Sequence, residues 1–187
     1  RGAGGENERG GTRGVRSGCG RMGRGRPGEV ARVDGGELST LGEWEEEWDL
    51  LADCGVIVEG RMGQLAPKRA LMARIEAVRK PGSIISSNTS GIPINEIANG
   101  RSPDFKQHFL GTHFFNPPRY LKLLEIIPTP DTAPEVVDFM VQFGGETLGK
   151  GVVVCKDTPN FIANRFIAIV GSFLAEYALE NGYSIAE

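Results

Sequence analysis

Short apolar runs that suit buried strands alternate with amphipathic segments that suit helices through most of this 187-residue chain. The predicted strands are residues 56–58, 83–87, 109–115, 123–127 and 152–155, and the predicted helices are residues 67–78, 92–98 and 133–143. Breaker residues separate them: Pro81-Gly82 ends the first helix and Asn99-Gly100 ends the second. Strands that alternate with helices predict a largely parallel, doubly wound α/β sheet.

A longer apolar segment follows the last predicted strand. Asp157 or Thr158 is expected to cap a helix there, with Pro159 near its first position, and the helix should run past Asn164 towards Leu179. Its apolar residues lie on more than one side, and such a helix needs packing partners on several sides. The chain is therefore expected to stop inside a second, helical domain.

The N-terminal segment has a different composition. Residues 1–36 hold 13 of the 27 glycines and eight arginines against four acidic residues. Because so little apolar surface is available to offset the ordering entropy, residues 1–40 are predicted to be disordered. The letters GCGRMG at 18–23 match G-x-G-x-x-G, but no buried strand precedes them and no helix follows, which favours a chance match. An RNA-binding Arg/Gly tail is an alternative, weakened by the lack of aromatic residues for stacking.

Charge and cysteine usage exclude several function classes. The chain carries a net charge of −3 although residues 1–36 carry +4, so the globular part is acidic and is not expected to bind nucleic acid. No apolar run approaches the roughly 18 residues that would suggest a membrane span. The three cysteines, Cys19, Cys54 and Cys155, match neither a metal spacing nor a disulfide framework. They predict no metal site and a reducing, cytoplasmic compartment.

Polar residues follow the predicted strands at the edge where α/β sheets bind ligands. His113 lies near the end of one strand and Glu125 lies in the next. Adjacent strands would set the carboxylate against the imidazole, where it would fix the tautomer and stabilise the imidazolium formed when the ring takes a proton. The alternatives are a core or capping histidine and a glutamate on an exposed strand face. An acid between Leu124 and Ile126, however, should have a partner.

Three further polar residues carry weaker signals. Ser90 ends the loop after a strand, where its hydroxyl can donate to a substrate oxygen, although a turn serine is the alternative. Asn164 offers a donor and an acceptor one turn into the last helix, and taken alone it would be a helix-surface residue. His108 lies in the polar stretch DFKQH and is expected to face solvent.

Three segments closely resemble the NAD-dependent L-3-hydroxyacyl-CoA dehydrogenases of fatty-acid β-oxidation. They are SSNTSGI at 86–92, FLGTHFFNPPRYLKLLEIIPT at 109–129 and KDTPNFIANRF at 156–166. The form HFFNPPRYLKLLEII looks most like bacterial members that carry this activity in a larger polypeptide. The resemblance extends from about Trp48 to Glu187 and is not seen in residues 1–40.

The resemblance implies a Rossmann-like NAD-binding domain, a C-terminal helical domain through which relatives dimerise, and an active site between the two. By this resemblance, the catalytic histidine of the family falls on His113 and its glutamate partner on Glu125. The serine that contacts substrate and cofactor falls on Ser90, and the asparagine of the helical domain falls on Asn164. Two further cofactor contacts of the family fall on Lys68 and Asn116. In the family mechanism the histidine removes the 3-hydroxyl proton of an acyl-CoA while hydride leaves C3 for the nicotinamide.

The chain also departs from the family pattern. Relatives begin with a strand and a glycine-rich turn that grips the pyrophosphate, followed by an acidic residue for the ribose, and neither is recognised here. A second glutamate near the cofactor falls on Gly63. The expected organisation is a disordered segment 1–40, a partial doubly wound Rossmann-like domain 41–156, and the first helix of an all-α domain in 157–187.

Two hypotheses follow for the function. The first is an oxidoreductase that converts L-3-hydroxyacyl-CoA to 3-oxoacyl-CoA with NAD, using His113 as general base. The alternative is a non-catalytic fragment or binding module of the same family that lacks the dinucleotide loop. Binding of NADH distinguishes the two.

Overall fold

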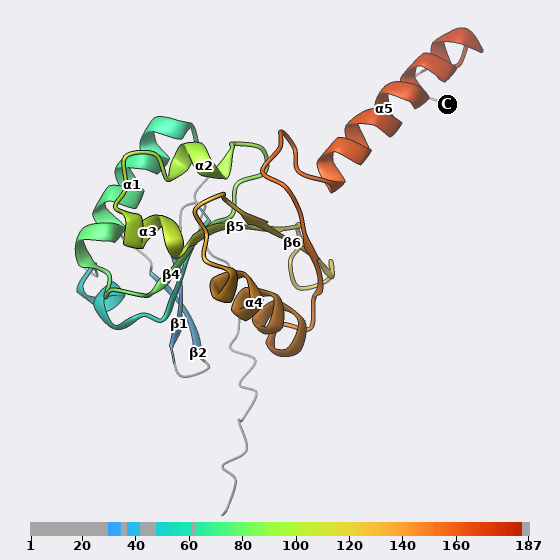
Figure 1. Ribbon diagram of the computed structural model, residues 1–187. Helices are drawn as coiled ribbons and strands as arrows, with labels where there is room; N and C mark the ends of the chain where they lie inside the picture. The colour runs from blue at the N-terminus through green and yellow to red at the C-terminus, as the bar shows by residue number, and fades with distance from the viewer. Residues whose placement is uncertain (1–29, 35–36, 42–47, 61–62, 185–187) are drawn as a thin grey trace, which may run out of the picture.

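The computed structural model describes residues 30–34, 37–41, 48–60 and 63–184, which build a seven-stranded sheet with helices on both faces (Figure 1). The strands are β1 (Val30–Asp34), β2 (Glu37–Leu41), β3 (Val56–Glu59), β4 (Ile84–Ser87), β5 (Phe109–Phe114), β6 (Leu123–Pro128) and β7 (Gly151–Val154). The helices are the 3-10 helix η1 (Trp48–Asp53), α1 (Leu65–Val78), α2 (Ile94–Ile97), α3 (Pro103–Gln107), α4 (Pro134–Gln142), the π-helix η2 (Phe143–Thr147) and α5 (Ala163–Glu180). The predicted α/β class is confirmed.

The strand order is β2-β1-β3-β4-β5-β6-β7, and the pairing is mixed. The pairs β3/β4, β4/β5 and β6/β7 are parallel, as predicted, whereas β1/β2, β1/β3 and β5/β6 are antiparallel. The expectation of a largely parallel sheet is therefore wrong in part. The connection 115–122 is shorter than the dozen or so residues of a parallel crossover, so β6 returns antiparallel to β5.

The prediction that residues 1–40 are disordered is wrong for two strands. β1 pairs antiparallel with β3, with Val30 opposite Glu59, and β2 pairs with the other side of β1. The backbone hydrogen bonds of an existing sheet edge order this segment, and composition alone does not register that contribution. Residues 1–29, including the GCGRMG letters, lie outside the described residues, as does the tail interpretation that rests on them.

Alternate residues of the central strands face opposite helical layers, as the pleat requires. On one face Ile57, Ile85 and Phe109 pack with apolar residues of α1, α2 and α3. On the other face, residues of the same strands pack with Val136 and Met140 of α4. Burial of each such large apolar side chain stabilises the fold by about 1.5–3 kcal/mol. Packing against the two helical layers fixes the position of the strand ends, where the polar residues lie.

Gly111 of β5 allows α2 to pack unusually close to the sheet. A Cβ atom at this position would lie 2.7 Å from Cδ1 of Ile94 at the start of α2 and 3.1 Å from Cβ of Ile127. Any larger residue would force the side chain of Ile94 or its neighbours to shift. The position of α2 matters because the loop that carries Ser90 leads directly into it.

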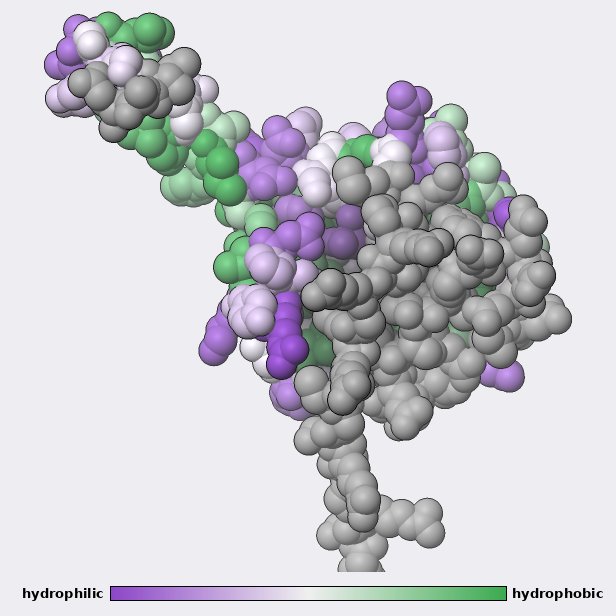
Figure 2. All heavy atoms as spheres, turned by 180° about the vertical axis from the view of Figure 1, so that it is seen from behind, coloured by the Kyte–Doolittle hydropathy of each residue, from purple (hydrophilic) through white to green (hydrophobic). Residues whose placement is uncertain are grey.

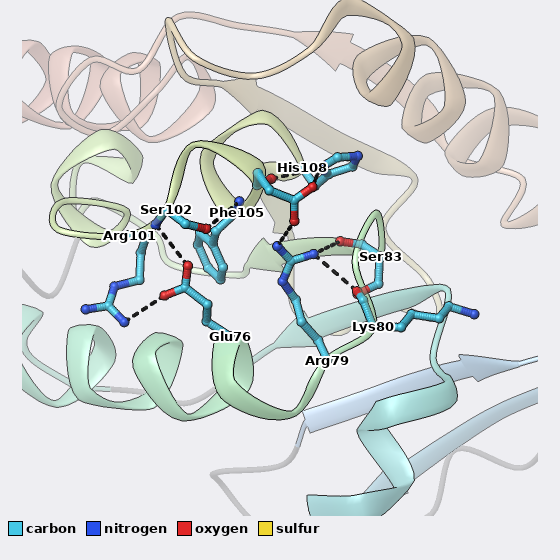
Figure 3. Close-up of polar contacts among 9 residues, drawn as sticks. Glu76, Arg79, Lys80, Ser83, Arg101, Ser102, Phe105 and His108 are labelled. Carbon is cyan, nitrogen blue, oxygen red and sulfur yellow. Dashed lines mark hydrogen bonds and ion pairs between the residues drawn. The ribbon is translucent and has the colours of Figure 1, made fainter.

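Arg79, at the C-terminal end of α1, joins that helix to the start of β4 and to α3 (Figure 3). Its guanidinium donates to the carbonyl oxygens of Lys80 and Ser83 and forms an ion pair with Asp104. His108 closes the same cluster, with Nδ1 2.7 Å from the carbonyl oxygen of Asp104. Only 24% of the His108 side chain is exposed, so the prediction that it faces solvent is wrong in part.

Glu76 of α1 forms a second link to the segment before α3 (Figure 3). One carboxylate oxygen accepts the backbone N–H of Ser102 at 2.9 Å, and the other pairs with Arg101 at 3.0 Å. Burial works to raise the pKa of this carboxyl, but the Ser102 hydrogen bonds and the charges of Arg101 and Arg79 outweigh it, so the pKa is lowered.

The last helix, α5, begins later than the sequence indicated. Asn160 and Phe161 adopt left-handed backbone angles, with φ of 64° and 49°, and α5 starts at Ala163. The prediction that Asp157 or Thr158 caps this helix is wrong, because the left-handed pair interrupts helical geometry before it begins. The domain boundary at residue 157 stays a prediction.

Helix α5 extends away from the sheet (Figure 1), and its apolar side chains are exposed over its length (Figure 2). The exposed apolar residues are Phe166, Ile167, Ile169, Val170, Phe173, Leu174, Tyr177 and Leu179. Such a surface is what a helix presents when none of the described residues packs over its apolar side. In the described part of the chain, no helix has the length and apolar character needed to span a membrane.

Candidate active site

His113 and Glu125 meet across the antiparallel pair of β5 and β6. They are register partners, and Nδ1 of His113 lies 2.7 Å from Oε2 of Glu125. Residues opposite each other in such a pair project from the same face, so the two side chains are held together by the sheet itself. Both are buried, with 4% and 0% exposure. The predicted histidine–carboxylate contact is confirmed.

The second oxygen of Glu125 binds the start of α5. Oε1 accepts the backbone N–H groups of Ile162 at 3.0 Å and Ala163 at 2.9 Å. The first N–H groups of a helix have no partner within the helix, and a carboxylate there is stabilised by the helix dipole as well. The buried charge of Glu125 is thus hydrogen-bonded on both oxygens. The sequence did not reveal this contact.

The imidazole of His113 lies next to two aromatic rings. The centroid of Phe115 is 4.4 Å away and that of Phe161 is 5.6 Å away. Because Nδ1 donates to the carboxylate, Nε2 is the nitrogen that can accept a proton. No described residue forms a hydrogen bond with Nε2. The arrangement therefore presents one basic nitrogen of fixed orientation.

Ser90 and Asn164 are also brought together. Asn164, in the first turn of α5, donates from Nδ2 to the backbone carbonyl oxygen of Ser90 at 3.1 Å. Ser90 is exposed, and its hydroxyl has no hydrogen-bond partner among the described residues. The contact thus leaves the hydroxyl available to a ligand. A role for either side chain in binding substrate stays a prediction.

Two asparagines flank the end of β5. Asn116 is exposed and follows the strand by two residues, as expected for a group near a bound ligand. Asn88, which the sequence interpretation overlooked, follows β4 and accepts the backbone N–H of Phe114 at 3.0 Å. It fixes the Ser90 loop to the end of β5. Its position within SSNTSG, directly after a strand, was the available signal.

Lys68 lies in α1 and is almost fully buried. Its ammonium is 2.9 Å and 2.8 Å from the two carboxylate oxygens of Glu59, and the Ser87 hydroxyl donates to Glu59 Oε2 at 2.6 Å. Glu59 and Ser87 end the parallel strands β3 and β4, so the group lies at the ligand-binding edge of the sheet. A cofactor contact for Lys68 stays a prediction. Glu59 was missed, although an acid that ends an apolar strand needs a partner.

Asp157 performs a different task from the one predicted. Its two carboxylate oxygens accept the backbone N–H groups of Ile94 and Asn95, each at 2.8 Å, so it caps α2 rather than α5. Cys155 precedes it on the same segment. Burial, together with the negative charges of Glu125 and Asp157, raises the pKa of the Cys155 thiol to about 11. This cysteine is therefore a protonated core residue near neutral pH.

The chemistry available is proton transfer at an oriented imidazole. Within the described residues, no group of three or more histidine, cysteine, aspartate or glutamate side chains is placed to hold a metal ion. A base nitrogen, a carboxylate that orients it and an exposed serine at the strand ends suit the removal of a proton from a bound hydroxyl.

Comparisons with known proteins agree on one family. The family model described as "3-hydroxyacyl-CoA dehydrogenase, NAD binding domain" matches residues 21–158. The similarity thus begins earlier than residue 48, where the sequence interpretation placed it. A probable 3-hydroxyacyl-CoA dehydrogenase of Bacillus subtilis is 47% identical over 87% of this chain, and one of Deinococcus radiodurans is 43% identical over 89%. The chain spans 20% and 48% of these two relatives.

A solved structure is similar as well. The 3-hydroxybutyryl-CoA dehydrogenase of Escherichia coli superposes with a TM-score of 0.65 at 34% identity, over 71% of this chain and 27% of the E. coli chain. The fold and the sequence similarity therefore point to the same relatives.

Proposed function

The chain belongs to the 3-hydroxyacyl-CoA dehydrogenase family, and from this premise we propose that it carries the base of an NAD-dependent oxidation of L-3-hydroxyacyl-CoA to 3-oxoacyl-CoA. The observation that carries the proposal is the contact of 2.7 Å between His113 Nδ1 and Glu125 Oε2. It leaves Nε2 as the only ring nitrogen that can take the 3-hydroxyl proton.

The residues have separate roles in this proposal. His113 removes the hydroxyl proton, and Glu125 holds the ring and stabilises the imidazolium that results. Ser90 donates a hydrogen bond to the substrate oxygen from its exposed hydroxyl. Asn164 holds the backbone of Ser90 from α5 and lies beside the reacting group. An oriented base of this kind contributes about 10²- to 10⁴-fold in rate.

The matched domain is the NAD-binding domain of the family, and the polar groups at the ends of β4 and β5 fit the nicotinamide end of that cofactor. The exposed amide of Asn116 and hydroxyl of Ser90 offer the donors that such a group needs, and Lys68, which is paired with Glu59, would contact the same cofactor. When bound, NAD supplies the acceptor for the hydride that leaves C3. The chain orients the substrate and removes the proton.

The setting of this activity is part of the proposal. The substrate class is acyl-CoA, and the step is the oxidation at C3 in fatty-acid β-oxidation. The cytoplasmic location, the absence of a nucleic-acid partner and dimerisation through the helical domain follow from the sequence features and the family, and they are proposed with it.

The test compares unchanged protein with His113→Gln for reduction of a short 3-oxoacyl-CoA by NADH, and it measures NADH affinity separately by fluorescence. We expect a loss of 10²- to 10⁴-fold in kcat with NADH affinity nearly unchanged, since His113 acts on the substrate proton. Full activity of His113→Gln would contradict the base assignment. Failure of the unchanged protein to bind NADH would favour the non-catalytic alternative.

A further inference from the structure

We propose that Asp157 is a positioning residue for Ser90, through its hold on the start of α2; this inference rests on the function proposed for Ser90. The carboxylate comes from the segment between β7 and α5, which lies beside the start of α2. Its Oδ1 and Oδ2 accept the N–H groups of Ile94 and Asn95, each at 2.8 Å. Two short bonds to one ionised group fix both the distance and the direction of the helix start.

Helix α2 depends on this outside cap. It has four residues, its N-cap residue is Pro93, and no side chain of its own segment caps it. The first N–H groups of a helix have no partner within the helix, and a negative charge beside them is stabilising. Asp157 supplies both the acceptors and the charge. Without it, both N–H groups would lose their acceptors and the backbone at the start of α2 would be held less firmly.

Movement at the start of α2 would reach Ser90, which lies four residues before Ile94. The loop between them is held by few contacts: the Thr89 hydroxyl accepts the N–H of Ile92 at 3.3 Å, and Asn164 donates to the Ser90 carbonyl oxygen. The amide oxygen of Asn160 also lies 3.1 Å from where a Cβ of Gly91 would be. Asn164 thus holds the loop at Ser90, and Asp157 holds the start of α2 that follows it.

The same segment also sets the position of the base. Five residues after Asp157, the N–H of Ile162 binds Glu125, whose other oxygen holds His113. One stretch of backbone therefore contacts both the Ser90 loop and the carboxylate behind the base. Loss of the Asp157 contact would shift Ser90 relative to His113 while the pair of His113 and Glu125 stays intact. A misplacement of about 1 Å at a reacting group can cost on the order of 10²-fold in rate.

The experiment uses the chain with Asp157→Ala and Asp157→Asn, and Asp138→Ala on the exposed face of α4 as the matched control. Amide hydrogen exchange is followed by NMR at Ile94 and Asn95, together with the Ser90 amide and the downfield Nδ1 proton of His113. We expect Asp157→Ala to remove protection at both amides and shift the Ser90 signal, with the His113 proton unchanged. Asp157→Asn keeps one acceptor oxygen and should retain part of the protection, and Asp138→Ala should change none of these signals.

Kinetics of the active protein add the functional readout. Asp157→Ala should lower kcat by about 10- to 100-fold with the KM for NADH little changed. The proposal is overturned if Asp157→Ala keeps the hydrogen-exchange protection of the unchanged protein at Ile94 and Asn95. It is also overturned if this variant loses that protection while its Ser90 signal or its kcat stays unchanged. If His113→Gln is fully active, or the unchanged protein is inactive, the proposed function fails instead, and the amide protection and the Ser90 signal still decide on Asp157.

Discussion

Glu125 binds His113 through one carboxylate oxygen and the start of α5 through the other. Oε2 lies 2.7 Å from Nδ1 of His113, and Oε1 accepts N–H groups at 3.0 Å and 2.9 Å. The Glu125 carboxylate therefore both orients the imidazole and binds the backbone at the start of α5. A change in the attachment of α5 is therefore transmitted to the imidazole through Glu125.

Replacement of Glu125 by Gln should impair both functions of the carboxylate. The amide has one acceptor oxygen, so either the imidazole or the α5 backbone faces its NH₂ group. We expect kcat to fall by about 10- to 100-fold, and the free energy of unfolding to fall by about 1–3 kcal/mol because a buried donor is left unsatisfied. NADH-dependent turnover and urea unfolding measure the two effects. Glu135→Gln, on the exposed first turn of α4, is the control and should leave both unchanged.

The pair of His113 and Glu125 was predictable because strand alternation and register are local properties of the sequence. The second contact of Glu125 was not, since it depends on the left-handed backbone at Asn160 and Phe161, which delays the start of α5. Asp157 has the local features of a helix cap, but nothing in the sequence distinguishes a cap for the next helix from a cap for α2, 63 residues earlier. Both of these missed contacts join segments that are far apart in the sequence.

The acid stability of the chain should depend on Glu76. Its pKa is lower in the folded protein than the ordinary 4.5, so its stabilising contribution is present above about pH 4.5 and is lost as the pH falls through the folded value. Urea unfolding from pH 7 down to pH 3, in unchanged protein and in Glu76→Gln, measures this. We expect the variant to lose roughly 1 kcal/mol at neutral pH and to show a shallower decline in acid. Equal pH slopes for the two proteins would contradict the assignment.

Cys155 should react slowly with alkylating reagents. With a pKa of about 11 instead of 9.0, its thiolate fraction near pH 8 is lowered by roughly 100-fold, and burial slows reagent access further. Peptide mass spectrometry after iodoacetamide treatment measures the alkylation of Cys155 separately from that of Cys54. Because the negative charge of Glu125 contributes to the shift, Glu125→Gln should speed the reaction. Because the pKa of Cys155 is higher in the folded protein, its thiol contributes fully to the free energy of unfolding below pH 9. This contribution is lost as the pH rises through about 11.

The left-handed backbone at Asn160 should make this position sensitive to the side chain. With φ at 64°, glycine fits without strain, so Asn160→Gly should raise the free energy of unfolding by up to about 1 kcal/mol, whereas Asn160→Ala should lower it by about 1 kcal/mol. Urea unfolding measures both. Asn99→Gly, at an exposed turn position without a left-handed φ, is the control and should not stabilise. A stabilising Asn160→Ala would show that the backbone there is not left-handed.

Replacing either member of the buried pair Lys68 and Glu59 should lower the free energy of unfolding more than replacing both. Their ammonium and carboxylate are 2.8 Å apart with 3% and 0% side-chain exposure, so each buried charge is in direct contact with the other. Lys68→Met alone leaves a buried carboxylate, and Glu59→Leu alone leaves a buried ammonium; each should cost about 3–5 kcal/mol. The double variant removes both charges and should recover most of that loss, although the Ser87 hydroxyl then lacks its acceptor. Urea unfolding of the four proteins gives the coupling free energy, and additive losses would mean that the two charges do not compensate each other.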